Sequence, residues 1–223
     1  MIKSRQEIKA IAKAAMKQQR GTSIVALLLA VLIGGVLGAI SGVISIAQPL
    51  FGALVMFGVI FFIAVPLSVN LNGIFIKIYN KENASANELF SNFSVNYLRK
   101  VGGMAWMALF TYLWTLLLVI PGIIKGYAYS MTPFILADCP NVPAKEALKL
   151  SMRMTNGHKM KLFIFDLSFI GWLLLGTLTL HILTFAFVLP YYQTAYTGYY
   201  VELRETAIAN GIIDRAELEG RKQ

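Results

Sequence analysis

The stretch NVPAKEALKLSMRMTNGHKMKLFIFDLSFIGW, residues 141–172, joins a basic amphipathic helix to an apolar segment that contains one acid. Lys145, Lys149 and Arg153 recur every four residues, so they share one face of a helix. Apolar residues occupy another face of the same helix. A helix with a Lys/Arg stripe opposite an apolar side is typical of one that lies in the headgroup layer of a membrane. We therefore expect an interfacial helix over about residues 142–156, with a solvated helix of a soluble domain as the alternative.

The cations in and after this helix are the candidate contacts to lipid headgroups. Basic residues close to anionic lipid contribute roughly 1 kcal/mol each to membrane binding. The candidates are Lys145, Lys149, Arg153, His158, Lys159 and Lys161. Membrane lipids with anionic headgroups at the cytoplasmic face are thus the first expected partner.

The composition of the chain points in the same direction. Of its 223 residues 57% are hydrophobic and 14% are charged, against about 25% charged in typical soluble domains. A net charge of +9 would suggest nucleic acid in a soluble protein, but here cations retained on the cytoplasmic side account for it. Cys139 is the single cysteine, and no Cys/His spacing suggests a metal. We expect an integral membrane protein with no nucleic acid partner, metal or cofactor.

The apolar runs predict an all-α fold, a polytopic membrane helix bundle of about six transmembrane helices in three hairpins. A crossing helix needs roughly 20 apolar residues. The predicted spans within a single transmembrane domain, residues 22–201, are about 22–47, 50–78, 101–120, 121–137, 162–180 and 183–201. The remaining segments are a basic amphipathic helix over 1–21, interfacial helices over about 85–98 and 142–156, and a tail over 202–223. It stays open whether spans three and four cross fully or form a re-entrant pair.

The distribution of charge orients these spans. With the N-terminus inside, every Lys and Arg except Lys125 falls in a cytoplasmic segment. Such an excess of cations decides the topology of membrane proteins, so we expect both termini in the cytoplasm. The outer face then consists of three short turns and offers no domain that could capture a solute or peptide.

Small residues line one face of the first span. Gly34, Gly38 and Gly42 are four residues apart, a spacing that lets another helix backbone approach closely. They form a candidate helix-packing seam. Contact within the chain is the first interpretation, and dimerisation or contact with another membrane protein is the alternative.

Asp166 lies about one turn inside the fifth predicted span. An acid within a membrane is costly and often functional. Together with Tyr192, Gln193 and Tyr196 of the last span it forms a candidate intramembrane polar site. The alternatives are that Asp166 pairs near the inner surface with Lys159, Lys161 or a neighbouring helix, and that the tyrosines anchor the span at the interface.

Three X-Pro pairs occupy similar places in the second helix of each predicted hairpin. They are Val65–Pro66, Ile120–Pro121 and Leu189–Pro190. The pattern suggests a structural repeat of helix plus hairpin. Broken helices of this kind often border binding sites in transporters.

Several stretches also resemble a known family. They are MIKSRQEIKAIAKAA (1–15), ELFSNF (88–93), LVIPGIIKGYAYSMTPFILA (118–137), AKEALKLSMRMTNGHKMKLFIFDLSFIGW (144–172) and LPYYQT (189–194). The chain is similar to the domain-of-unknown-function 975 family of bacterial multi-pass integral membrane proteins. Cys139 and His181 depart from it, where Asn and a small residue are expected. The resemblance implies a helical fold in the bacterial cytoplasmic (inner) membrane, and it brings no established activity or catalytic residue.

Two classes of function follow. The sequence contains no paired carboxylates, nucleophile–base arrangement, HExxH or phosphate-binding glycine loop, so we expect no enzyme and no catalytic residues. The leading hypothesis is a non-enzymatic scaffold or accessory subunit that interacts with lipids, other membrane proteins or a second copy of itself. The alternative is a small transporter or export component that uses Asp166 and a tyrosine-lined cleft.

Overall fold

The computed structural model describes residues 2–91, 93–178 and 183–220, and its regular structure in these ranges is helical. The first half contains α1 Arg5–Gln18, α2 Arg20–Ala47, α3 Pro49–Val59, the π-helical segment η1 Ile60–Ala64, α4 Val65–Tyr79, α5 Glu88–Ser91 and α6 Tyr97–Leu117. The second half contains α7 Val119–Tyr129, α8 Thr132–Asp138, α9 Ala144–Thr155, α10 Lys159–Leu167, α11 Ile170–Leu178, the π-helical segment η2 Thr184–Val188, α12 Leu189–Ala209 and α13 Arg215–Leu218.

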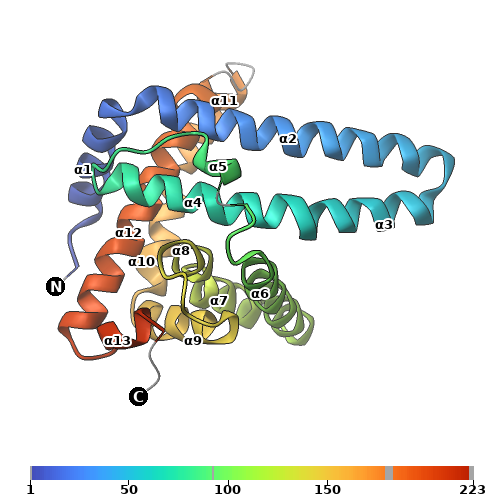
Figure 1. Ribbon diagram of the computed structural model, residues 1–223. Helices are drawn as coiled ribbons and strands as arrows, with labels where there is room; N and C mark the ends of the chain where they lie inside the picture. Colours follow the sequence, from blue (N-terminus) through green and yellow to red (C-terminus); the bar gives the residue numbers. More distant parts are fainter. Residues whose placement is uncertain (1, 92, 179–182, 221–223) are drawn as a thin grey trace.

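The first hairpin stands out from the other helices. In Figure 1, α2 and α3 extend side by side to a turn at Gln48, far from both chain ends. A side-chain carbon at Gly52 would lie 2.5 Å from the Ser45 Cα, so only glycine allows α3 to approach α2 this closely. Within the described residues, the helices over Arg20–Ala47 and Pro49–Tyr79 are the two whose length and apolar composition would allow them to cross a membrane.

The two π-helical segments precede prolines. Pro66 and Pro190 each stand second in their helix, directly after η1 and η2. Proline lacks an N–H and its ring clashes with the carbonyl four residues earlier, and a π turn gives that ring room. The equivalence of Val65–Pro66 and Leu189–Pro190 is thereby visible in the structure. Pro121 differs, because it lies in the first turn of α7, where a proline disturbs no helical hydrogen bond.

The six-span bundle is not confirmed, because in the described residues only Arg20–Ala47 and Pro49–Tyr79 are long and apolar enough to cross a membrane. Two of the other predicted spans are broken. Residues 121–137 form α7 and α8, separated by a turn in which the Ser130 hydroxyl donates to the Tyr127 carbonyl at 2.9 Å. Residues 162–178 likewise form α10 and α11, separated where the Ser168 hydroxyl donates to the Phe165 carbonyl at 2.5 Å. Serine side chains that bond to the preceding turn compete with the helical ladder. The end of that span and His181 lie in 179–182, outside the described residues.

The predicted interfacial helices and tail also have different limits. The helix expected over 142–156 is α9, and the one expected over 1–21 is α1. Only α5 is helical in the described part of 85–96, because Asn96 adopts a left-handed backbone conformation and α6 begins after it. The last predicted span, 183–201, continues as α12 to Ala209. The first part of the predicted tail, 202–223, is therefore still helical.

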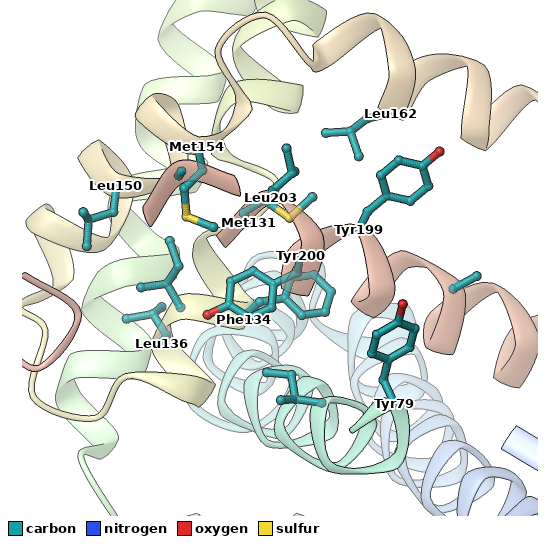
Figure 2. Packing of buried hydrophobic residues seen from close by; sticks show 14 of the residues in the cluster. Tyr79, Met131, Phe134, Leu136, Leu150, Met154, Leu162, Tyr199, Tyr200 and Leu203 are labelled. Carbon is teal, nitrogen blue, oxygen red and sulfur yellow. The ribbon is translucent and has the colours of Figure 1, made fainter. Parts of the chain in front are cut away.

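The core of the body forms around α12. Figure 2 shows Phe134 of α8 beside Tyr200 of α12, and their rings stack at 5.3 Å between centroids. Leu150 and Met154 of α9 are buried in the same cluster. Ile8 of α1 is fully buried there too, so the apolar side of α1 packs largely on protein.

Outside this core, large apolar side chains are exposed along two pairs of helices and on the successive helices α10 and α11. At the tip between α2 and α3, Ile46 and Leu50 are 86% and 79% exposed. At the tip between α6 and α7, Leu117 and Ile120 are 71% and 72% exposed. In α11, Leu174 is 63% exposed. These two helix pairs and α11 therefore present apolar surfaces to their surroundings.

Candidate functional site

Asp166 of α10 accepts hydrogen bonds from two tyrosines on two other helices. The Tyr127 hydroxyl, on α7, donates to Oδ2 at 2.8 Å, and the Tyr192 hydroxyl, on α12, donates to Oδ1 at 2.9 Å. Asp166 itself is half-buried. The carboxylate is thus held in one orientation at the meeting point of α7, α10 and α12.

This carboxylate lies in the wall of a cleft of about 340 Å³, which we call the Asp166 cleft. Its lining residues are Tyr127, Phe163, Asp166, Leu167, Phe169, Ile170, Val188, Leu189 and Tyr192. Val188 and Leu189 come from the junction of η2 and α12, so the interruption in that helix forms part of the wall. Apart from Asp166 and the two tyrosines, the lining is apolar.

A second hollow, of about 380 Å³, shares Tyr127 with the first. Its lining residues are Thr111, Thr115, Gly122, Ile123, Gly126, Tyr127, Ser130 and Tyr196. The ring of Tyr196 stacks on that of Tyr192 at 5.6 Å. Tyr127 and this stacked pair therefore connect the two hollows.

The predicted polar site is brought together only in part. Asp166, Tyr192 and Tyr196 lie close to one another, but the Gln193 amide donates to Asn72 Oδ1 at 2.5 Å, toward α4. Successive residues on a helix point about 100° apart, so Gln193 cannot share the face of Tyr192. Asp166 accepts its hydrogen bonds from tyrosines and not from the Lys159 or Lys161 considered from the sequence.

Sequence reasoning missed Tyr127. Its only signal was a tyrosine in a neighbouring apolar segment, which gives no indication of the residue it contacts. Lys125, two residues earlier, places its ammonium 4.8 Å from the centre of the Trp114 ring.

Lys9 of α1 is a cation close to the Asp166 cleft. Its ammonium donates to the Ser168 hydroxyl at 2.6 Å and lies 4.1 Å from the centre of the Phe169 ring. Burial, followed by repulsion from Arg5, lowers the pKa of Lys9. The contact binds α1 to the turn between α10 and α11.

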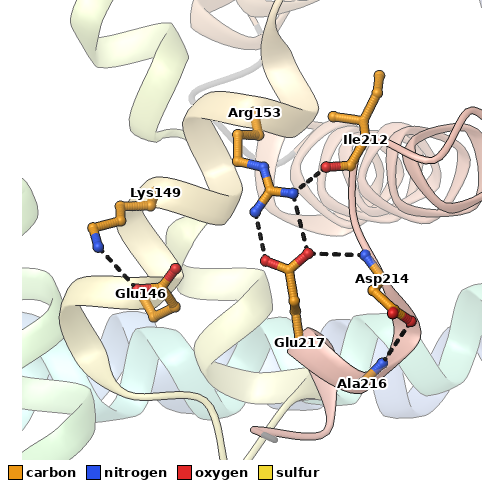
Figure 3. Close-up of polar contacts among 7 residues, drawn as sticks. All are labelled: Glu146, Lys149, Arg153, Ile212, Asp214, Ala216 and Glu217. Carbon is orange, nitrogen blue, oxygen red and sulfur yellow. Dashed lines mark hydrogen bonds and ion pairs between the residues drawn. The ribbon is translucent and has the colours of Figure 1, made fainter. Parts of the chain in front are cut away.

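The predicted headgroup contacts on α9 have partners within the chain. Figure 3 shows Arg153 bound by the Glu217 carboxylate, with hydrogen bonds of 2.5 and 3.1 Å, and by the Ile212 carbonyl. Lys149 pairs with Glu146 at 3.1 Å. Lys145 lies over the Trp106 ring at 4.6 Å. Arg153 therefore connects α9 to the C-terminal segment.

The rest of that set follows α9. His158 is half-buried, and burial followed by the charge of Lys161 lowers its pKa, which favours the neutral imidazole. Lys161 is exposed and Lys159 half-exposed. A lipid contact by these side chains stays a prediction.

A second polar cluster lies where α6 begins. Lys100 is only 6% exposed, and its ammonium donates to Asn70 Oδ1 at 2.7 Å. Arg99 donates to three backbone carbonyls, those of Leu136, Cys139 and Val142, at 2.7, 2.8 and 2.9 Å. Arg99 thus caps the C-terminal end of α8. The sequence shows this pair only as two cations before an apolar run.

Among the described residues, no other helix packs closely on the glycine seam of α2. A side-chain carbon added at Gly34, Gly38 or Gly42 would meet nothing within 4 Å. Close packing within the chain, the first interpretation from sequence, is therefore not what these residues provide. The tight contact of the hairpin lies instead at Ser45 and Gly52.

Among the described residues, no group of three or more His, Cys, Asp or Glu side chains could hold a metal ion.

Comparison with known families matches residues 101–207 to the model described as "Protein of unknown function (DUF975)". No curated protein and no solved structure matches the chain. The matched residues include Tyr127, Asp166 and Tyr192.

Proposed function

With this chain assigned to the DUF975 family, we propose that it works within a membrane as a small transporter or export component whose substrate binds beside Asp166. The family description names no activity, so the argument rests on the geometry of the chain. The Asp166 cleft is the observation that carries it.

The membrane setting is supported by the exposed apolar surfaces of the α2–α3 and α6–α7 pairs and of α11. Soluble monomers rarely expose contiguous apolar patches of more than a few hundred Å². Lipid tails would cover the tips at Ile46, Leu117 and the outer side of α11 without cost. We propose that all three hairpins insert into the bacterial inner membrane, with both termini, α1 and α9 on the cytoplasmic side. The distribution of Lys and Arg supports that orientation.

The transport role is supported by the Asp166 carboxylate, which lies in an apolar cleft and whose hydrogen-bond donors there are uncharged hydroxyls. Tyr127 and Tyr192 orient the Asp166 carboxylate but do not neutralise it. Ionisable residues in membrane segments are costly and tend to mark paths for ions or substrates. The helix interruption at η2 borders the same cleft, as broken helices do at the binding sites of transporters. For this reason the transporter takes precedence over the scaffold that the sequence alone favoured.

The scaffold remains a second candidate because of the glycine face of α2. Gly34, Gly38 and Gly42 are open to another helix backbone. This face supports association with a second membrane protein or a second copy, which is compatible with transport.

The proposal can be tested in cells that lack their own copy of the protein. Native chain, Asp166→Asn and Asp214→Asn are compared at equal membrane abundance on a panel of toxic neutral, cationic and anionic compounds. Asp214 is an exposed acid of the C-terminal segment, and asparagine preserves its capping role, so it is a matched control. We expect the native chain and Asp214→Asn to change the sensitivity of the cells to at least one compound, and Asp166→Asn to lose that effect. Equal behaviour of the native chain and Asp166→Asn on every compound would refute the role of this site.

A further inference from the structure

We propose that the Asp166 cleft binds a lipophilic monocation, in which apolar or aromatic substituents surround a single positive charge, such as a quaternary ammonium or phosphonium ion. This inference rests on the proposed function and names its substrate class.

The walls of the cleft are rich in aromatic rings. Tyr127 packs edge-to-face with Phe163, at 6.1 Å between centroids and 88° between planes. Phe169 and Tyr192 form a second edge-to-face pair at 5.2 Å and 88°. All four residues line the cleft. The face of an aromatic ring attracts cations, and sites for quaternary ammonium groups are commonly built from several such rings.

The chain already uses one of these rings in this way. The Lys9 ammonium lies 4.1 Å from the centre of the Phe169 ring. Lys9 is not among the residues that line the cleft. The described lining offers one carboxylate, that of Asp166, so the site suits a single positive charge better than a divalent one.

The charge of the lining residues determines whether the cleft favours a positively or a negatively charged ligand. Among the described residues of the lining, Asp166 is the one acid, and none is Lys, Arg or His. An anion would be repelled, and a neutral molecule would gain apolar contact and at most a hydrogen bond to the carboxylate, without the charge attraction that a cation gains. Each Asp166 oxygen accepts one tyrosine hydrogen bond, while an ionised carboxylate has about four acceptor positions. The carboxylate thus keeps capacity to attract a cation.

The apolar walls exclude small hydrated cations. Metal ions such as Ca²⁺ and Mg²⁺ require about six oxygen ligands, and a single carboxylate among apolar side chains cannot replace their water. A lipophilic cation is weakly hydrated and loses little on leaving water. Its apolar substituents can pack against Leu167, Ile170 and Val188. A volume of about 340 Å³ lies at the lower end of ligand sites, which are roughly 300–1,000 Å³, so it accommodates one small ligand.

The test uses two ions of the same shape and opposite charge. The full chain is held in lipid nanodiscs, and binding of tetraphenylphosphonium and of tetraphenylborate is measured by equilibrium dialysis against empty nanodiscs. We expect saturable binding of one phosphonium per chain and only unsaturable partition of the borate. Asp166→Asn should weaken phosphonium binding by about tenfold or more, because it removes the charge and preserves the size.

Two further variants keep the result interpretable if Asp166→Asn is poorly folded. Asp214→Asn should bind phosphonium like the native chain. Phe163→Leu removes one ring of the wall at a side chain that is 40% exposed, so it should fold normally and bind phosphonium a few-fold more weakly. Loss of binding in Asp166→Asn alone, with native binding in Phe163→Leu, would reject the aromatic walls as part of the site.

Equal saturable binding of the two ions, or native phosphonium binding by Asp166→Asn, would overturn the ligand class. The cell assay distinguishes this failure from failure of the proposed function. If Asp166→Asn still loses the cellular effect, the transport site stands and its substrate is not a lipophilic cation. If neither assay depends on Asp166, both proposals fail.

Discussion

The Tyr192 hydroxyl lies 2.9 Å from Asp166 Oδ1 and donates a hydrogen bond to it, which joins α12 to α10 across 26 residues of chain. Tyr127 completes the arrangement from α7. Because each hydroxyl bonds to a different oxygen, the carboxylate cannot rotate without breaking both contacts. The orientation of Asp166 toward its cleft therefore depends on side chains from three separate helices.

Removing one of these hydroxyls should cost stability. Tyr192→Phe keeps the ring and its stacking but deletes the donor to Asp166. Hydrogen bonds to charged groups contribute roughly 1.5–3 kcal/mol, and the half-buried position of Asp166 favours a loss of about 1–2 kcal/mol. Denaturation in detergent micelles, followed by circular dichroism, measures the change. Tyr112→Phe, at a side chain 62% exposed, should change stability by less than about 0.5 kcal/mol, and an equal loss in both variants would contradict the role of the Asp166 contact.

The ion pair between α9 and the C-terminal segment should make stability depend on pH. The Arg153 hydrogen bonds lower the pKa of Glu217 below its ordinary value. A carboxyl with a lowered pKa in the folded state stabilises the fold above its unfolded pKa, near 4.3, and loses this contribution as the pH falls through the folded pKa. Both side chains are partly exposed, so the contribution is below about 1 kcal/mol.

Glu217→Gln should therefore melt at a lower temperature than the native chain at pH 7, and the difference should disappear toward pH 3. In an Arg153→Gln background the same replacement should have almost no effect. A difference that persists at low pH or in that background would show that Glu217 acts through another partner.

Cys139 should react slowly in the folded chain. The residue is 6% exposed, and burial, followed by the charge of Asp138, raises the pKa of its thiol to about 11. Only the thiolate is nucleophilic, so its low population at pH 8 adds to the steric protection. We expect N-ethylmaleimide to modify denatured chain at least about tenfold faster than folded chain at pH 8, as measured by mass spectrometry. Equal rates would show that the segment between α8 and α9 opens readily.

The arrangement of the first hairpin can be tested by labelling. Cys139→Ser removes the single cysteine, and a cysteine is then introduced by Gln48→Cys at the exposed tip or by Arg215→Cys in the C-terminal segment. In intact cells, a membrane-impermeant maleimide should label the first position and reach the second only after permeabilisation. Labelling of Gln48→Cys only after permeabilisation would mean that α2 and α3 do not reach the outer face.

Arg99 should be a main contributor to the stability of the body. Arg99→Met keeps much of the apolar stem but removes the donor to the Leu136, Cys139 and Val142 carbonyls, of which Cys139 still accepts from the Val142 N–H at 3.2 Å. An unsatisfied buried polar group costs about 1–3 kcal/mol, so we expect a loss of about 3 kcal/mol. Chemical denaturation measures it, with Arg5→Met on the exposed side of α1 as the control that should change little.

Local patterns predicted much of the secondary structure. The four-residue spacing of Lys145, Lys149 and Arg153 predicted the helix that is now α9. The uninterrupted apolar run predicted α2 almost to the residue. These features follow from side-chain periodicity and propensity along a short stretch of chain, which the sequence contains directly.

Contacts between distant segments were the weakest part of the prediction. Three contacts join residues that lie 39 to 121 positions apart in the chain. They are Tyr127 with Asp166, Arg153 with Glu217, and Gln193 with Asn72. The break at Ser168 was missed because the segment around it is as apolar as an unbroken span.

The sequence by itself determined that the chain is helical, that its hairpins are apolar and where its cations gather, since these are properties of successive residues. Only the tertiary structure decided which side chains face one another. The rotation of each helix about its axis is set by packing against its neighbours, and a difference of about 100° between adjacent residues separates Tyr192, which reaches Asp166, from Gln193, which does not. The cleft and its charge follow from that rotation.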